Sequence, residues 1–92
     1  MRKSKPKFSL GQIVATRCVI AEVSQQEITH ALSRHVVGDW GDLCEEDLQA
    51  NEDALASDAR LFSKYSSTEG TIFWIITECD RSVTTVLLPS DY

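Results

Sequence analysis

The feature that most constrains the fold is the run Gly-Asp-Trp-Gly-Asp-Leu at residues 38–43. Its two glycines, Gly38 and Gly41, permit the positive φ angles and close backbone approaches that a sharp turn needs. The ring of Trp40 between them is typical of an aromatic anchor that packs into a core. The run therefore predicts a tight loop around a buried tryptophan.

A helix is predicted directly after this loop. Asp42 and Glu45 have the spacing of a capping box, in which the Asp42 carboxylate accepts a free N–H of the first turn. More acidic residues follow in that turn, where the helix dipole favours negative charge. We expect the helix to end near residues 55–56. The stripe of this helix that faces the core is predicted to be Cys44, Leu48, Asn51 and Leu55.

Negative charge is concentrated in this part of the chain. Eight of the 14 acidic residues lie between positions 39 and 58, with no Lys or Arg among them. Such a run is usually a solvated helix face, but it also suits contact with a basic protein surface. The net charge of −5 argues against a nucleic-acid binder, which needs a basic face for phosphates. The candidate binding residues of this acidic face are Asp39, Asp42, Glu45, Glu46, Glu52 and Asp53.

The length of 92 residues suits one domain with a single core, and we assign residues 8–92 to it. The basic residues 1–7 are predicted to be a flexible tail. The apolar segment of a signal peptide does not follow them, and no apolar run is long enough to span a membrane. We therefore expect a cytoplasmic protein that makes no membrane contact.

The C-terminal third of the chain predicts a three-stranded antiparallel meander. Residues 60–66 alternate between two faces, and residues 71–78 are apolar on both faces, as in a central strand. Residues 83–88 return as the third strand, and the short connections make the pairing antiparallel. If the third strand is exposed, two copies can pair across a two-fold axis, so the pattern leaves a homodimer open.

The N-terminal half supplies helices and one short strand. Residues 12–16 predict a strand that joins the sheet at an edge. Thr16 suits the cap of a short helix over residues 17–23, although β-branched residues favour a longer strand as the competing interpretation. Ser24 and Glu27 have a second capping-box spacing, which predicts a helix to about His35. Two to three helices on one face of the meander give an α+β fold.

No motif for nucleophilic catalysis, phosphate binding or metal binding occurs in the sequence. The three cysteines have no paired spacing, so we interpret them as reduced thiols rather than zinc ligands. His35 ends an apolar helix stripe and is interpreted as a partly buried structural histidine rather than a catalytic base. We therefore expect no enzymatic activity, no metal and no cofactor.

A second candidate surface lies around the turn between the last two predicted strands. Two carboxylates and a guanidinium meet there, and an ion pair of Arg81 with Glu78 or Asp80 is expected to stabilise the turn. On this alternative the protein is a structural or regulatory module that recognises a partner through the meander, and its acidity serves only solubility. The residues of this alternative surface are Asp80, Arg81, Thr84 and Thr85.

Several segments resemble one protein family. The motif His-x-x-Gly-Asp-Trp-Gly-Asp-Leu-Cys-Glu-Glu-Asp at residues 35–47 is the most specific of them, and the likeness extends in order over residues 8–92. The family consists of short proteins encoded on bacterial plasmids and integrative elements, usually described as plasmid-related. Where members have a Pro-Gly turn, this chain has Arg17 and Cys18. Some members are labelled as type I restriction modification subunits, but this chain has no Gly-rich cofactor loop to support that label.

The resemblance implies a mobile genetic element, where small acidic proteins often act against host defence nucleases. It supplies no catalytic residue to carry over to this chain. Together with the acidic face, it predicts a non-enzymatic interaction protein whose partner is a basic, nucleic-acid-handling protein of the CRISPR or restriction machinery. Direct contact with nucleic acid is not expected.

Overall fold

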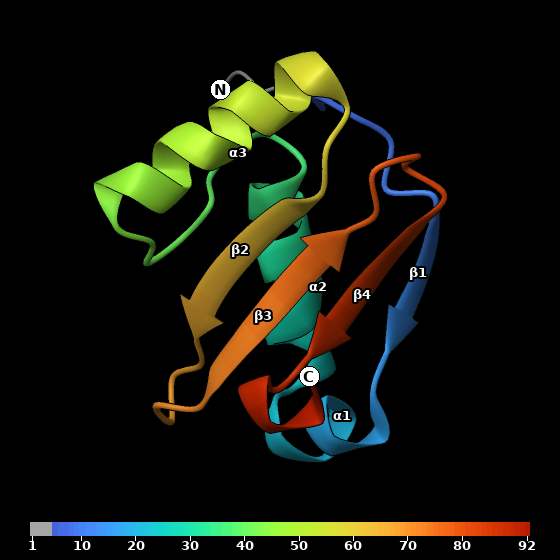
Figure 1. The fold of residues 1–92 in the computed structure, drawn as a ribbon. Coiled ribbons are helices and arrows are strands. Elements are labelled where there is room, and N and C mark those ends of the chain that lie inside the picture. Colours follow the sequence, from blue (N-terminus) through green and yellow to red (C-terminus); the bar gives the residue numbers. More distant parts are fainter. Residues whose placement is uncertain (1–4) are drawn as a thin grey trace.

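The computed structural model describes residues 5–92 and places three α-helices against a four-stranded sheet with strand order β1-β4-β3-β2 (Figure 1). The predicted α+β class is confirmed. The elements are β1 (Gln12–Ala15), α1 (Arg17–Glu22), α2 (Gln25–His35), α3 (Glu45–Ser57), β2 (Leu61–Ser66), β3 (Ile72–Thr77), β4 (Val83–Leu87) and a final 3-10 turn, η1 (Pro89–Asp91).

The meander is antiparallel as predicted, with β3 in the centre between β2 and β4. The predicted N-terminal strand also exists, but β1 runs parallel to β4, so the whole sheet is mixed. Gly11, at φ 64°, lets the chain pass directly beside the Arg81–Ser82 backbone, where a Cβ atom would clash with both carbonyl oxygens. Because β1 covers the edge of β4, the third strand of the meander is not exposed, so the condition for pairing two copies through that strand is not met.

Both predicted caps at the start of the chain are present. The Thr16 hydroxyl accepts from the Val19 N–H at 3.2 Å, and the Ser24 hydroxyl accepts from the Glu27 N–H at 3.2 Å. Residues 17–22 are therefore helical, and the competing interpretation of a longer strand is wrong.

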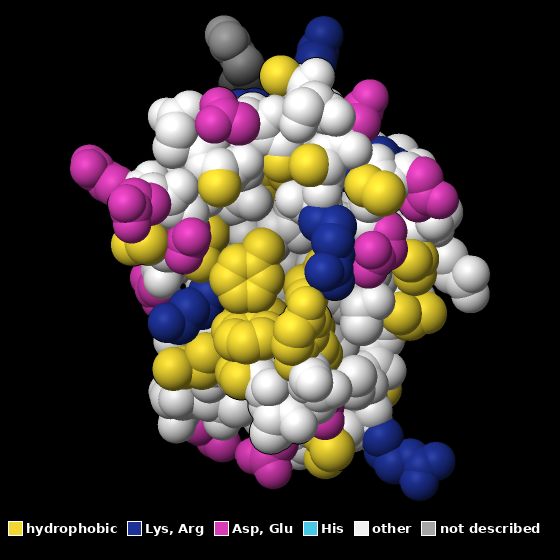
Figure 2. All heavy atoms as spheres, in the orientation of Figure 1, with side chains coloured by type: hydrophobic (Ala, Val, Ile, Leu, Met, Phe, Trp, Pro, Cys, Tyr) yellow, Lys and Arg dark blue, Asp and Glu magenta, His cyan; other side chains and the backbone are white. Residues whose placement is uncertain are grey.

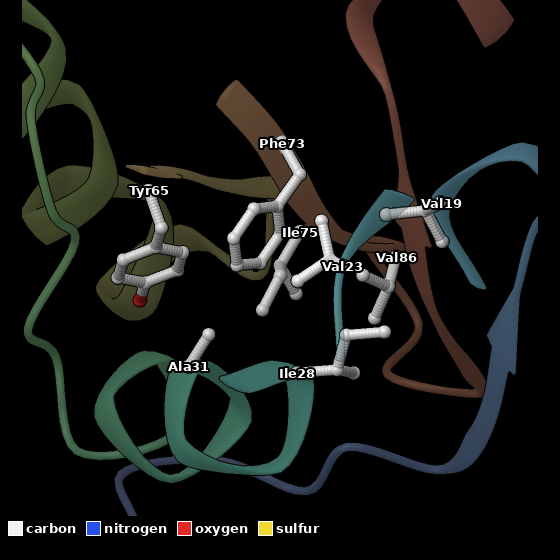
Figure 3. Packing of buried hydrophobic residues seen from close by; sticks show 8 residues of the cluster. All are labelled: Val19, Val23, Ile28, Ala31, Tyr65, Phe73, Ile75 and Val86. Atoms are coloured by element: carbon white, nitrogen blue, oxygen red, sulfur yellow. The ribbon is translucent and has the colours of Figure 1, made fainter. Parts of the chain in front are cut away.

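The main core lies between the sheet and the two helices α1 and α2, which cover one face (Figure 1). Figure 3 shows Ile28 and Ala31 of α2 pointing toward Phe73 and Ile75 of the sheet. A smaller cluster forms under α3, where Trp40, Ala54 and Leu61 are buried together. The predicted role of Trp40 as a core anchor is confirmed by its exposed fraction of 3%.

The predicted N-cap of α3, Asp42, is wrong by two residues. The helix begins at Glu45, its N-cap is Cys44, and no side chain bonds to the cap position. Asp42 lies outside the helix because its backbone N–H donates to the Lys64 carbonyl at 2.8 Å, next to a bridge between Gly41 and Lys64. A Cβ atom at Gly41 would clash with that carbonyl, so glycine is what permits this pairing.

The buried face of α3 also differs from the predicted stripe. Asn51 and Ala54 are buried, Leu48 and Leu55 are half-buried, and Cys44 is exposed. The Asn51 side chain bonds both backbone groups of Phe62, donating to its carbonyl and accepting from its N–H. The helix is therefore fixed to β2 through an amide as well as through apolar contacts.

The predicted basic tail falls partly outside the described residues, because Arg2 and Lys3 belong to the part that is not described. Lys7 has a defined place, since its backbone N–H donates to the Val36 carbonyl at 2.8 Å. Phe8 follows it and stacks near Trp40, with 6.2 Å between the ring centroids. The packed part of the chain thus already includes residues 7 and 8.

Candidate functional site

An open hollow of about 690 Å³ lies between α3 and the loop that precedes it. The indole of Trp40 forms part of its wall, and its Nε1–H donates to a Glu52 carboxylate oxygen at 2.9 Å. That bond orients the Glu52 carboxylate beside an aromatic edge. The hollow is lined by Gly38, Trp40, Glu45, Glu46, Leu48, Gln49 and Glu52.

The structure brings three of the predicted acidic residues together in this hollow, namely Glu45, Glu46 and Glu52. Asp53 is exposed on the same helix, where it accepts from the Gln49 amide at 3.0 Å. Asp42 is exposed but does not line the hollow. Acidic side chains gather over α3 in the space-filling view (Figure 2).

Asp39 does not contribute a free charge to this acidic face. Its carboxylate forms a two-point contact with Arg34, at 2.8 Å to Nε and 3.1 Å to the second guanidinium nitrogen. The Arg34 guanidinium holds the pKa of Asp39 below its usual value. The same guanidinium lies 4.7 Å from the Tyr65 ring centroid. Asp39 therefore serves to lock the loop to α2.

The role of Trp40 in the hollow was not predicted from the sequence. Trp40 and Glu52 are far apart in the chain, and neither a motif nor a helical spacing connects them. The contact arises because the loop at Gly41 pairs with β2 and turns the indole toward α3. Only the three-dimensional structure reveals this.

The residues of the alternative surface do not form one exposed patch. Arg81 donates to the carbonyls of Ala54, Ala59 and Glu78, at 3.1, 2.6 and 3.1 Å, and so caps the end of α3. The predicted ion pair of Arg81 with a neighbouring carboxylate is wrong. Arg81 has the φ of 60° that directs its side chain back toward that helix end.

The carboxylates near Arg81 have other partners. Glu78 forms an ion pair with Arg60 at 3.3 Å, and Asp80 accepts from the Ser82 hydroxyl at 2.6 Å. Thr84 is completely buried, whereas Thr85 is half-buried on the opposite face of the sheet. This turn is therefore a structural joint between the sheet and α3.

His35 lies at the centre of a buried chain of polar groups. Its Nδ1 is 2.5 Å from the Ser63 hydroxyl, and its Nε2 is 2.9 Å from the Thr77 hydroxyl, which in turn contacts Thr84 at 2.8 Å. Thr84 donates to the Leu10 carbonyl at 2.7 Å, so Thr77 donates to Thr84 and accepts from Nε2–H. The proton on Nε2 is thus assigned from this chain of hydrogen bonds, and in the neutral imidazole Nδ1 accepts from Ser63.

The environment of His35 favours this neutral form. Burial lowers its pKa to about 4, and its exposed fraction is 0%. A histidine bonded to a serine is the geometry of an activated nucleophile, but Ser63 is also completely buried, so a substrate does not reach either atom. The expected partial burial is corrected to complete burial, and we interpret His35 as a structural residue.

No α-helix of the described chain covers the face of the sheet opposite α1 and α2 (Figure 1). Phe62 and Trp74 meet edge to face on it, with centroids 5.0 Å apart, and Trp74 meets Tyr92 at 5.8 Å. Hydrophobic side chains gather over β2 and β3 in this view, with Lys and Arg beside them (Figure 2). The hollow there, about 300 Å³, is lined by Arg60, Leu61, Phe62, Trp74, Ile76 and Tyr92.

Within residues 5–92, no group of three or more His, Cys, Asp or Glu side chains is placed to hold a metal ion. The helices of this part of the chain also lack the length and apolar character that crossing a bilayer requires. No family model, curated protein or solved structure matches the chain. The candidate function therefore depends on the surfaces themselves.

Proposed function

We propose that this protein is a non-enzymatic, cytoplasmic interaction protein of a mobile genetic element, and that it binds a basic host protein through the acidic surface of α3. The observation that carries the proposal is the hollow lined by Glu45, Glu46 and Glu52, in which Glu52 accepts a hydrogen bond from Trp40. The carboxylates attract Lys and Arg, while the half-buried Leu48 offers apolar contact to the stems of those side chains.

The charge of this surface is not balanced locally. The two ion pairs of the described residues, Arg34 with Asp39 and Arg60 with Glu78, leave the carboxylates of α3 without a basic partner. Such a field raises the association rate with a basic partner and penalises acidic ones. A nuclease or a CRISPR component has a basic surface because it handles nucleic acid, and the resemblance to plasmid-encoded proteins supports this class of partner.

The test is capture of partners from a bacterial lysate by the immobilised protein, at low and moderate salt, with identification by mass spectrometry. We expect a basic nucleic-acid-handling protein whose capture falls as salt rises. In the double variant Glu45→Lys, Glu46→Lys, capture of that protein should fall roughly tenfold or more.

The matched control is Glu22→Lys, Glu69→Lys, which changes the net charge equally at exposed sites away from α3. Capture by this control should stay near that of the unchanged protein. If both double variants lose the partner equally, overall charge rather than the α3 surface is responsible, and the proposal is wrong.

One observation favours recognition through the meander as a second candidate function. Phe62, Trp74 and Tyr92 form an aromatic cluster on the uncovered sheet face, and aromatic residues with an adjacent arginine are typical of interface centres. Ile72, two residues before Trp74 on β3, is exposed on the same face. On this alternative the double variant Ile72→Ser, Tyr92→Ser loses the captured partner, and the α3 variant keeps it. The same capture experiment therefore separates the two surfaces.

A further inference from the structure

The two edges of the sheet differ in how far the rest of the chain covers them. The outer edge of β2 is partly covered, because Lys64 donates its backbone N–H to the Trp40 carbonyl and accepts from Asp42. The other edge is β1, and the described part of the chain places nothing beyond it (Figure 1). A strand edge with free hydrogen-bonding groups is a template for a further strand.

The direction of the free groups on β1 follows from its pairing. Gln12 donates its N–H to the Ser82 carbonyl and Thr16 donates to the Val86 carbonyl, so the even-numbered residues face β4. By alternation, the N–H and C=O groups of Ile13 and Ala15 point away from the sheet. Four backbone groups are thus available along this edge.

The side chains next to this edge are apolar and exposed. Ile13 is 49% exposed, Val14 is 38% exposed, and Ile20 on the adjoining helix is 62% exposed. Ile13, Ala15 and Ile20 line a groove of about 540 Å³ between β1 and the helices. Natural edge strands are protected by shortness, charged residues, proline or a bulge; β1 is short, with four residues, but has no charged residue and no proline.

The distribution of charge favours a second copy of the chain as the partner that pairs with the free edge of β1. β1 bears no charged side chain, and the acidic helix α3 packs against β2 at the other side of the sheet, so two copies joined at β1 keep their acidic surfaces apart. The strand is also apolar on both faces, and the strand that best covers it is equally apolar and uncharged. β1 itself meets that requirement.

We propose that two copies pair antiparallel through β1 across a two-fold axis. Each copy contributes its four strands, so the dimer has one continuous eight-stranded sheet. Val14 then lies opposite Val14 of the second copy, and Ile13 exchanges hydrogen bonds with Ala15 of the second copy. This register uses the outward groups of both residues on each strand. It also brings the two Ile20 side chains and their grooves to one side of the junction, where they bury each other.

The test is the mass of the purified protein by analytical ultracentrifugation, over a concentration series that reaches about 1 mM. We expect a species of twice the 10.3 kDa chain mass. The variant Ile20→Lys should weaken dimerisation at least tenfold, because the pairing would bury its charge. The matched control Ile72→Lys alters an isoleucine that is 42% exposed on β3 and should leave the dimer unchanged.

A second variant tests the hydrogen bonds separately. Ile13→Pro removes an N–H that points away from β4, so it should abolish the dimer while the monomer keeps its fold by circular dichroism. A protein that stays at 10.3 kDa up to the highest concentration contradicts the proposal. So does a dimer that survives both Ile20→Lys and Ile13→Pro, or one that Ile72→Lys dissociates, because another surface must then form it.

Discussion

The buried imidazole of His35 couples the stability of the fold to pH at the scale of a single residue. Its pKa is lowered to about 4 in the folded protein, compared with 6.5 for an ordinary histidine. Between these two values the unfolded chain binds a proton that the folded chain does not bind, so stability falls as the pH decreases. The contribution is complete above pH 6.5 and is lost toward pH 4.

We expect this histidine to account for a decrease of about 3 kcal/mol in the free energy of unfolding between pH 7 and pH 4. Urea unfolding followed by tryptophan fluorescence at pH 7, 5.5 and 4 measures it. In His35→Gln most of the decrease between pH 6.5 and pH 4.5 should disappear, whereas His30→Gln, at an exposed position, should retain it. An equal pH dependence in His35→Gln and the unchanged protein would contradict the assignment.

At the scale of elements, α3 starts without the cap that most helices have. Cys44 has the backbone angles of an N-cap, φ −71° and ψ 165°, but its side chain accepts no hydrogen bond. Replacing its sulfur by oxygen in Cys44→Ser should provide an acceptor for a first-turn N–H and stabilise the protein by about 1 kcal/mol. The midpoint of urea unfolding reports this gain.

Two controls accompany the capping prediction. Cys79→Ser makes the same chemical change at an exposed turn and should shift the midpoint little. Asp42→Ala should also cost less than about 0.5 kcal/mol, because Asp42 is not the cap residue that its spacing predicted. A large loss in Asp42→Ala, with no gain in Cys44→Ser, would show that the cap assignment is wrong.

The comparison of α3 with the first two helices explains what could be predicted from the sequence. Thr16 and Ser24 cap helices through contacts three residues away, so the local pattern was sufficient. Asp42 has an equally good capping spacing, and Arg81 has carboxylates beside it in the sequence, but neither local contact forms. Instead, Asp42 bonds to Lys64 and Arg81 bonds to the end of α3. The meander, the caps of α1 and α2 and the buried tryptophan were therefore predictable, while the cap of α3, the parallel β1 and the wall of the acidic hollow were not.

At the scale of the whole molecule, the uneven charge should make stability depend on salt. The carboxylates of α3 repel one another, and the described residues contain only two ion pairs to weaken at high salt. Raising NaCl from about 10 mM to about 300 mM shortens the screening length from roughly 30 Å to less than 10 Å. We expect the free energy of unfolding to increase by about 1 kcal/mol.

The variants of the binding experiment serve as comparisons for this effect. Glu45→Lys, Glu46→Lys should reduce the stabilisation by salt more than Glu22→Lys, Glu69→Lys does, because only the former pair interrupts the acidic helix. The midpoints of urea unfolding at the two salt concentrations measure the stabilisation by salt in each variant. A midpoint that falls as salt is added would mean that attraction between surface charges dominates.

The parallel pairing of β1 with β4 also determines when the sheet can be completed during synthesis of the chain. Gln12 is the register partner of Val83 and Ala15 that of Val86, so the pairing joins segments that are 71 positions apart in the sequence. A ribosome adds residues one after another, so among the four described strands β1 is synthesised first and β4 last. The first strand to be made is thus the last to find its place in the sheet. Until β4 is made, the apolar residues of β1 lack the strand with which they pair in the folded sheet.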